Sequence, residues 1–81
     1  MYFVYIIESS KNKRIYTGIT SDLSKRLKEH NNGENISTKA YKPWNILYSE
    51  EYDSRTKAAK REKYLKSGKG REYIKKLLNR Q

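Results

Sequence analysis

The first residues of the chain form a short apolar run, and this run constrains the fold more than any other feature. The run extends from Tyr2 to Ile7 and is aromatic and β-branched, without the alternation of apolar and polar residues that marks a half-exposed strand. It therefore predicts a strand that is buried on both faces. Because a chain of 81 residues buries only about 60–65% of its unfolded surface, its core is small and its large apolar residues must follow a pattern.

The rest of the chain divides into two strands and three helices. A polar turn at 9–13 leads to a second strand at 14–19, in which Gly18 indicates a bulge or a close backbone approach. After the first helix and an irregular loop at 34–43, a third strand is expected at 44–49. The order β-β-α-β-α-α indicates an α+β fold, with a small three-stranded, mostly antiparallel sheet flanked by helices. We expect residues 1–81 to form a single domain.

Capping residues and glycines predict where the helices begin and end. The first helix should begin near Thr20–Asp22, with Thr20 or Ser21 as its cap, and end at Gly33. Asp53 or Ser54 should cap a second helix that runs to about Ser67, with Gly68 as its stop. A last short helix is expected at 71–79.

The charge of the chain is strongly positive and unevenly distributed. The net charge is +10, of which residues 53–81 carry +8 and residues 1–52 only +2. An excess of this kind attracts polyanions, above all nucleic acid, through contacts with phosphate groups. We expect Lys57, Lys60, Lys63, Lys66 and Lys69 to contribute to such binding. The alternative is that these lysines only form a solvated helix surface.

Several classes of protein are excluded by what the sequence lacks. There is no cysteine, so disulfides and cysteine-ligated zinc are excluded. There is no apolar stretch long enough to span a membrane, and the first ten residues lack the features of a signal peptide. We expect a cytoplasmic protein without a membrane partner.

Polar residues interrupt the apolar faces of both main helices. Leu23 and Leu27 define the inward face of the first helix, and the helical period places Arg26 and His30 beside them. Lys25, Lys28 and Glu29 are expected to point outward. A lone histidine most often has a satisfied structural role, and without cysteine or a suitable serine it predicts no nucleophilic triad.

Glu62 interrupts the inward face of the second helix in the same way. It lies about 40° from Ala58 around the helix axis, on a stripe that Leu65 continues. A carboxylate in such a place needs a partner, because burying it alone is costly. The sequence leaves open a buried ion pair with Arg26 and a side chain that reaches the rim.

The order and spacing of these residues resemble those of the GIY-YIG nuclease superfamily. The resemblance rests on Phe3-Val4-Tyr5, then Tyr16-Thr17-Gly18, then Arg26, His30 and Glu62, and it covers roughly residues 2–75. The short stand-alone bacterial members are the most similar. This resemblance implies a metal-dependent endonuclease that hydrolyses phosphodiester bonds of DNA, in DNA repair or processing. The alternative is a non-catalytic nucleic-acid-binding module on the same fold.

The resemblance also implies a role for each matching residue. Tyr5 and Tyr16 are the motif tyrosines, one of which acts as a base, and the sequence does not decide which. Gly18 lets the substrate backbone approach, and Arg26 contacts the scissile phosphate. His30 supports the phosphate and the nucleophile. Glu62 is the sole carboxylate ligand of one Mg²⁺ or Mn²⁺ ion, a cation that keeps several waters and binds substrate phosphate.

The chain departs from the family pattern in two places, and we expect it to have no added domain. The first motif reads Phe-Val-Tyr where the family name implies Gly-Ile-Tyr, and Ile19 stands where several active relatives have a lysine. Larger relatives choose their targets with added domains. Two routes to a target therefore stay open: a protein partner, or recognition of structured or single-stranded nucleic acid, with DNA favoured over RNA.

Overall fold

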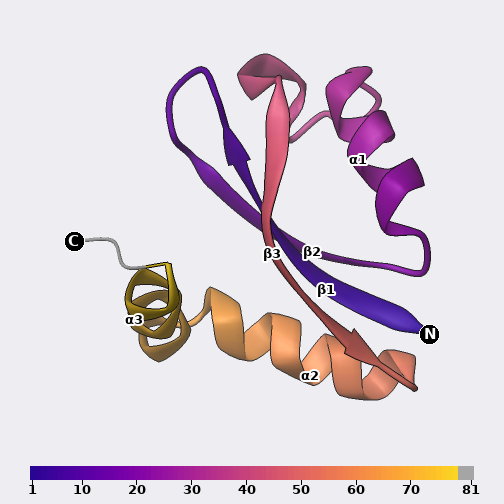
Figure 1. The fold of residues 1–81 in the computed structure, drawn as a ribbon, viewed down its shortest axis with the longest axis vertical. Helices are drawn as coiled ribbons and strands as arrows, with labels where there is room; N and C mark the ends of the chain where they lie inside the picture. The colour runs from indigo at the N-terminus through magenta and orange to yellow at the C-terminus, as the bar shows by residue number, and fades with distance from the viewer. Residues whose placement is uncertain (79–81) are drawn as a thin grey trace.

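The strand predicted at the N-terminus lies at the centre of the sheet. The computed structural model describes residues 1–78. In it, β1 (Tyr2–Ser9) pairs antiparallel with β2 (Ile15–Thr20) on one side and with β3 (Trp44–Tyr52) on the other (Figure 1). Four helical segments complete the structure: α1 (Leu23–Asn31), the 3₁₀ turn η1 (Lys39–Tyr41), α2 (Arg55–Lys66) and α3 (Gly68–Leu77). The predicted α+β fold and its element order are confirmed.

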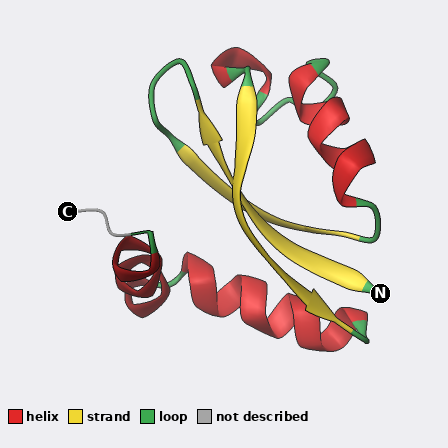
Figure 2. Cartoon of the chain, viewed as in Figure 1, coloured by secondary structure: helices red, strands yellow, loops and turns green. Residues whose placement is uncertain are grey.

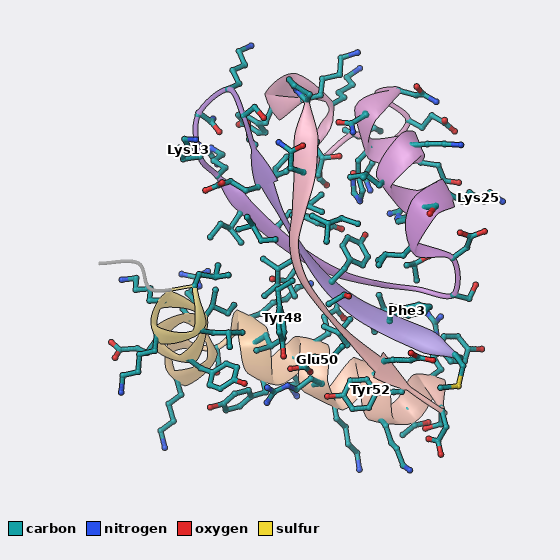
Figure 3. All side chains as sticks on the ribbon, in the orientation of Figure 1. Phe3, Lys13, Lys25, Tyr48, Glu50 and Tyr52 are labelled. Atoms are coloured by element: carbon teal, nitrogen blue, oxygen red, sulfur yellow. The ribbon has the colours of Figure 1, made fainter. Side chains whose placement is uncertain are left out.

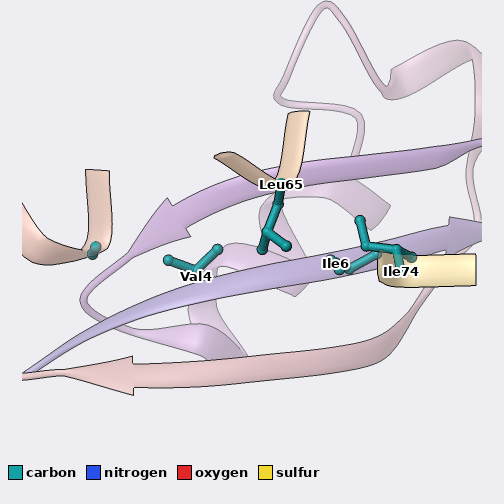
Figure 4. Packing of buried hydrophobic residues seen from close by; sticks show 5 residues of the cluster. Val4, Ile6, Leu65 and Ile74 are labelled. Carbon is teal, nitrogen blue, oxygen red and sulfur yellow. The ribbon is translucent and has the colours of Figure 1, made fainter. Parts of the chain in front are cut away.

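Helices cover both faces of the sheet. Helix α1 lies on one side, and α2 and α3 lie on the other (Figure 2). Val4 and Ile6 of β1 pack with Ala58, Leu65 and Ile74 on the α2–α3 side (Figure 4).

The opposite face of β1 packs under α1. Tyr5 and Ile7 form a second cluster with Trp44, and Leu23 and Leu27 of α1 pack against it. The four central side chains of β1 are at most 2% exposed, which confirms the prediction of a strand buried on both faces.

The cap of α1 differs from the prediction. Asp22 caps the helix, and its carboxylate accepts the backbone N–H of Lys25 at 3.1 Å. Thr20 instead closes a local turn, in which its hydroxyl oxygen accepts the N–H of Asp22. Thr20 and Ser21 were therefore wrong as caps, because the turn places Asp22 at the helix entrance. Gly33 follows the helix with a φ of 76°, the left-handed conformation that was expected there.

The junction between α2 and α3 is tighter than predicted. Ser54 caps α2 as expected, but Gly68 does not stop it, because α3 begins at Gly68. Ser67 ends α2 and also caps α3, with its hydroxyl oxygen accepting the N–H of Gly70 at 3.2 Å. The last helix therefore starts three residues earlier than predicted. Its expected end at Asn79 lies outside the described residues.

The loop at 34–43 and the third strand also show more order than expected. The turn η1 lies within the loop that was predicted to be irregular. Strand β3 continues to Tyr52, three residues beyond its predicted end, because β1 pairs with it along its whole length. No helix among residues 1–78 is long and apolar enough to cross a membrane.

A polar cluster joins the end of β3 to α2. Glu50 accepts hydrogen bonds from the hydroxyls of Tyr48 and Tyr52 and from Arg61, whose Nε and Nη2 lie 2.8 and 3.0 Å from its two oxygens (Figure 3). The Arg61 guanidinium also stacks on the ring of Tyr73, 4.9 Å from its centroid. Because the Glu50 side chain is only 14% exposed, this cluster fixes α2 against the sheet.

The neighbours of Glu50 lower the pKa of its carboxyl group. Burial raises the pKa of its carboxyl, but the hydrogen bonds from Arg61, Tyr48 and Tyr52 outweigh burial and lower the pKa to about 2. The ionised form therefore stabilises the fold fully above its usual pKa of 4.5, and this contribution disappears as the pH falls toward 2.

We predict that Glu50→Gln lowers the free energy of unfolding by about 3 kcal/mol at neutral pH, because it leaves Arg61 without its buried partner. Denaturant unfolding measures this. Glu51→Gln is the control, since it removes the same charge from an exposed neighbour on the same strand. The gap between the two variants should narrow as the pH falls below 4.5. Equal losses in both variants would show that the cluster does not hold α2.

Candidate active site

One face of the sheet brings together four of the five predicted catalytic residues, Tyr5, Tyr16, Arg26 and His30. Strand register pairs Tyr5 with Gly18 and Ile7 with Tyr16, so both tyrosines face α1. From α1, Arg26 and His30 reach back toward them, because residues four apart share one side of a helix. Two strands and one helix therefore converge on Tyr5.

The hydroxyl of Tyr5 is the centre of a hydrogen-bonded chain. It lies 2.9 Å from His30 Nε2, and Arg26 Nε donates to it at 3.3 Å. On the far side of the ring, His30 Nδ1 lies 2.7 Å from the hydroxyl of Thr38. His30 is fully buried and Tyr5 is 2% exposed, so these contacts replace all hydration of the imidazole.

One arrangement of protons satisfies every group in this chain. Arginine only donates, so the Tyr5 oxygen accepts from Arg26 and its O–H is left to donate to His30 Nε2. Nδ1 then carries the imidazole proton and donates it to Thr38, whose own hydroxyl points to the carbonyl of Asn35 at 3.5 Å. The geometry thus favours a neutral histidine with its proton on Nδ1.

Burial keeps both groups uncharged. It lowers the pKa of His30, and the positive charge of Arg26 lowers it further. Burial raises the pKa of the Tyr5 phenol, against the opposing effect of the hydrogen bond from Arg26. At neutral pH the pair is therefore an uncharged phenol and an uncharged imidazole.

Gly18 makes room for the Tyr5 phenol. A side-chain β-carbon built at Gly18 would lie 2.5 Å from the Tyr5 oxygen, 2.7 Å from Cζ and 3.1 Å from a ring carbon of Tyr16. The group that approaches this glycine is the side chain of Tyr5, and the β1–β2 register runs through Gly18 without a shift, so the predicted bulge or close backbone approach was wrong. A role for Gly18 toward substrate stays a prediction.

Arg26 is held at the edge of the site by an acidic neighbour. Its Nη1 lies 2.9 Å from Glu29 Oε1, and 31% of the Arg26 side chain is exposed. The prediction that Glu29 points outward was wrong: it is 26% exposed and orients the guanidinium. The spacing of three residues along the helix was the signal that could have revealed this pair.

Glu62 lies on α2, on the other side of the sheet from α1. It pairs with Lys66 at 3.2 Å and is 24% exposed, so the alternative of a buried pair with Arg26 was wrong. Burial is the main cause that raises the pKa of Tyr5, and the charge of Glu62 adds to it. The carboxylate is therefore within electrostatic reach of Tyr5.

The described residues offer a sparse set of metal ligands. Among residues 1–78 there is no group of three or more histidines and acids that could hold an ion. A single half-buried carboxylate suits a hard cation that keeps most of its waters and completes its shell with substrate phosphate. Glu62 fits this description.

Tyr16 is the more accessible of the two motif tyrosines. Its ring packs edge-on against His30 at a centroid distance of 5.2 Å and lies 6.4 Å from the ring of Tyr5. Unlike Tyr5 it is only half-buried, and it borders an open cleft that Lys66 also lines. A molecule arriving from solvent therefore meets Tyr16 before Tyr5.

The five predicted DNA-contacting lysines do not share one surface. All are exposed. Lys57 pairs with Asp53, while Lys60 and Lys63 lie with Arg55 on the outward side of α2. Of the five, Lys66 lies beside the candidate site, through its contacts with Glu62 and with the cleft next to Tyr16.

Two residues of the site were missed by the sequence analysis. Thr38, which is 1% exposed, accepts the His30 proton from within the loop. The indole N–H of Trp44 donates to the Thr38 carbonyl at 2.9 Å and fixes this part of the loop. The loop carries no periodic pattern, so the one available signal was that a buried histidine needs a second partner.

Known proteins match nearly the whole chain. The family model of the GIY-YIG catalytic domain matches residues 1–77. A UPF0213 protein of Staphylococcus saprophyticus is 36% identical over 67 residues, which are 82% of this chain and 80% of that protein. A UPF0213 protein of Haloquadratum walsbyi is 39% identical, over 82% of this chain and 74% of that protein.

A solved structure shares the fold. The solution NMR structure of a UPF0213 protein from Bacillus halodurans has a TM-score of 0.57 and 28% sequence identity. The match covers 95% of this chain and 85% of that chain. The family resemblance inferred from the motif residues is confirmed.

We predict that Gly18→Ala lowers the free energy of unfolding by about 1–3 kcal/mol, because the buried Tyr5 ring must move to accommodate a methyl group. Thermal denaturation measures this. Gly68→Ala is the matched control: no atom lies within 4 Å of its added carbon, and it should be neutral or stabilise by up to about 1 kcal/mol. If both variants melt alike, Gly18 is not required by the Tyr5 contact.

Proposed function

Because the chain belongs to the GIY-YIG family, we propose that it is a metal-dependent endonuclease that hydrolyses phosphodiester bonds of DNA. The observation that carries this proposal is the convergence of Arg26, His30 and both motif tyrosines on one face of the sheet. The net charge of +10 supports a nucleic acid as substrate.

We assign the contact with the scissile phosphate to Arg26. Its guanidinium is planar, permanently charged and partly exposed, and Glu29 and Tyr5 hold two of its nitrogens in place. A guanidinium fixed in this way can donate to phosphate oxygens without losing further side-chain entropy. It would stabilise the negative charge that develops as the phosphodiester bond breaks.

We assign different roles to the two tyrosines. The Tyr5 hydroxyl is already occupied by Arg26 and His30 and is shielded from solvent, so Tyr5 positions the arginine. The half-buried Tyr16 is the candidate base: once its O–H proton has passed to solvent, its phenolate oxygen can take a proton from an attacking water. His30, with no exposed surface, acts through Tyr5 and does not touch the phosphate itself.

Glu62 is the residue that would hold a divalent cation, Mg²⁺ or Mn²⁺. Such a cation, when bound, supplies positive charge beside the phosphate that is cut. Glu62 pairs with Lys66, and this pair can open to admit substrate and cation because Lys66 is 53% exposed.

We predict that Glu62→Gln lowers metal-dependent cleavage by more than about 100-fold, because the substitution removes the metal ligand. Labelled single-stranded, duplex and branched DNA, each with Mg²⁺, Mn²⁺ or EDTA, provide the assay. Glu72→Gln is the control, since it changes the net charge equally at an exposed site on α3. Glu62→Gln should cost at most about 0.5 kcal/mol of stability, because only an i,i+4 surface pair is lost.

Two outcomes would contradict the proposal. The wild-type protein could bind these DNAs without cutting them in either metal, which would indicate a non-catalytic binding module. Unchanged cleavage by Glu62→Gln would end its assignment as the metal ligand.

A further inference from the structure

A cleft of about 470 Å³ opens beside the candidate active site, between the edge strand β2 and helices α2 and α3. Its volume lies in the range of roughly 300–1,000 Å³ that is typical of small-molecule sites. Tyr16 and Thr17 of β2 line part of it, and the other six lining residues form two groups. Ile15, Leu65 and Ile74 form an apolar floor, and Lys66, Arg71 and Lys75 form a basic rim.

This combination selects a ligand with two parts. The apolar floor suits a flat, weakly polar group, since aliphatic side chains offer it contact area and few hydrogen bonds. The basic rim suits an anion, and Arg71 and Lys75 are both exposed and able to turn toward one. A nucleotide carries both parts, a base and a phosphate.

Tyr16 and Lys66 connect the cleft to the candidate active site. Tyr16 borders the cleft, and its ring packs on His30 on the α1 face of the sheet. Lys66 belongs to its rim and pairs with Glu62. A strand whose phosphate lies between Arg26 and Glu62 would therefore place an adjoining nucleotide in the cleft.

We propose that this cleft holds one unpaired nucleotide of the strand that is cut, with its base on Ile15, Leu65 and Ile74 and its phosphate on Arg71 and Lys75. The proposal rests on the endonuclease function and names its substrate class. A base in an intact duplex is stacked and paired and cannot enter such a cleft without leaving the helix. The preferred substrate is therefore single-stranded DNA or a locally unpaired strand.

Binding measurements in EDTA test the proposal without cleavage. The probes are a short fluorescein-labelled oligothymidylate, the same strand annealed to its complement, and an abasic strand with the same number of phosphates. Fluorescence anisotropy gives the affinity of each for the 81-residue protein. We expect the single strand to bind more tightly than the duplex and the abasic strand.

Two substitutions address the cleft. Arg71→Gln should weaken binding of the single strand about tenfold, which corresponds to the loss of one charge-assisted hydrogen bond. Arg55→Gln is the matched control: it removes an equal charge from an exposed helical site outside the cleft, and should weaken binding at most about twofold. Ile15→Glu should weaken binding as strongly as Arg71→Gln, because it places a carboxylate on the floor of the cleft. Ile15 is 43% exposed, so this variant should fold.

The result that would overturn the proposal is equal weakening by Arg71→Gln and Arg55→Gln, or equal affinity for the thymidylate and abasic strands. Either would show that the protein senses only the charge of the backbone. If both cleft variants weaken binding of single strands but the protein cuts no DNA in Mg²⁺ or Mn²⁺, the cleft assignment stands and the endonuclease function is wrong. If the protein cuts DNA and neither Arg71→Gln nor Ile15→Glu changes cleavage, the endonuclease function stands and the cleft assignment is wrong.

Discussion

The hydrogen bond between the Tyr5 hydroxyl and His30 Nε2 is the interaction on which the rest of the site depends. It joins the central strand to α1 in a place without water, and it leaves the Tyr5 oxygen oriented to receive Arg26. Gly18 has no side chain because the phenol occupies that space, and Thr38 is buried in its loop because the imidazole needs a second partner. A buried polar group without a partner costs about 1–3 kcal/mol. The position of each group in this hydrogen-bonded series therefore constrains the position of the next.

The two faces of the sheet contribute different parts of the site. The α1 face supplies the tyrosines, the arginine and the histidine, while the carboxylate comes from α2 on the opposite face. These parts can meet only around the edge strand β2, so the position of α2 on the sheet matters to the chemistry. Glu50 and Arg61 fix that position through a pair in which each side chain is at most 26% exposed. Arg61 precedes Glu62 directly, so a polar cluster outside the site sets the place of the candidate metal ligand.

The sequence predicted the elements and their order because each depends on local patterns: the apolar run at 2–7, the periodicity of α1, and the helix-capping Ser54. It also predicted that Arg26, His30 and Glu62 face inward, since helical angles follow from spacing alone. It could not predict the partners of these residues. Arg26 pairs with Glu29 and Glu62 pairs with Lys66, and each pair depends on side-chain rotamers that the sequence does not specify. Thr38 reaches His30 from a loop that has no periodic pattern. The cap at Asp22 and the start of α3 at Gly68 depended on turns for which several polar residues competed.

The state of the His30 ring tests this account most directly. The chain contains a single histidine, so a long-range ¹H–¹⁵N correlation spectrum of the imidazole shows one pattern that needs no assignment by mutation. The account predicts a neutral ring at neutral pH, with its proton on Nδ1 and protected from exchange, because Nε2 accepts the Tyr5 hydroxyl and burial lowers the pKa of the ring. A ring protonated on Nε2, or a charged imidazolium at neutral pH, would contradict it, because Tyr5 could then not donate to His30 and would not be held for Arg26.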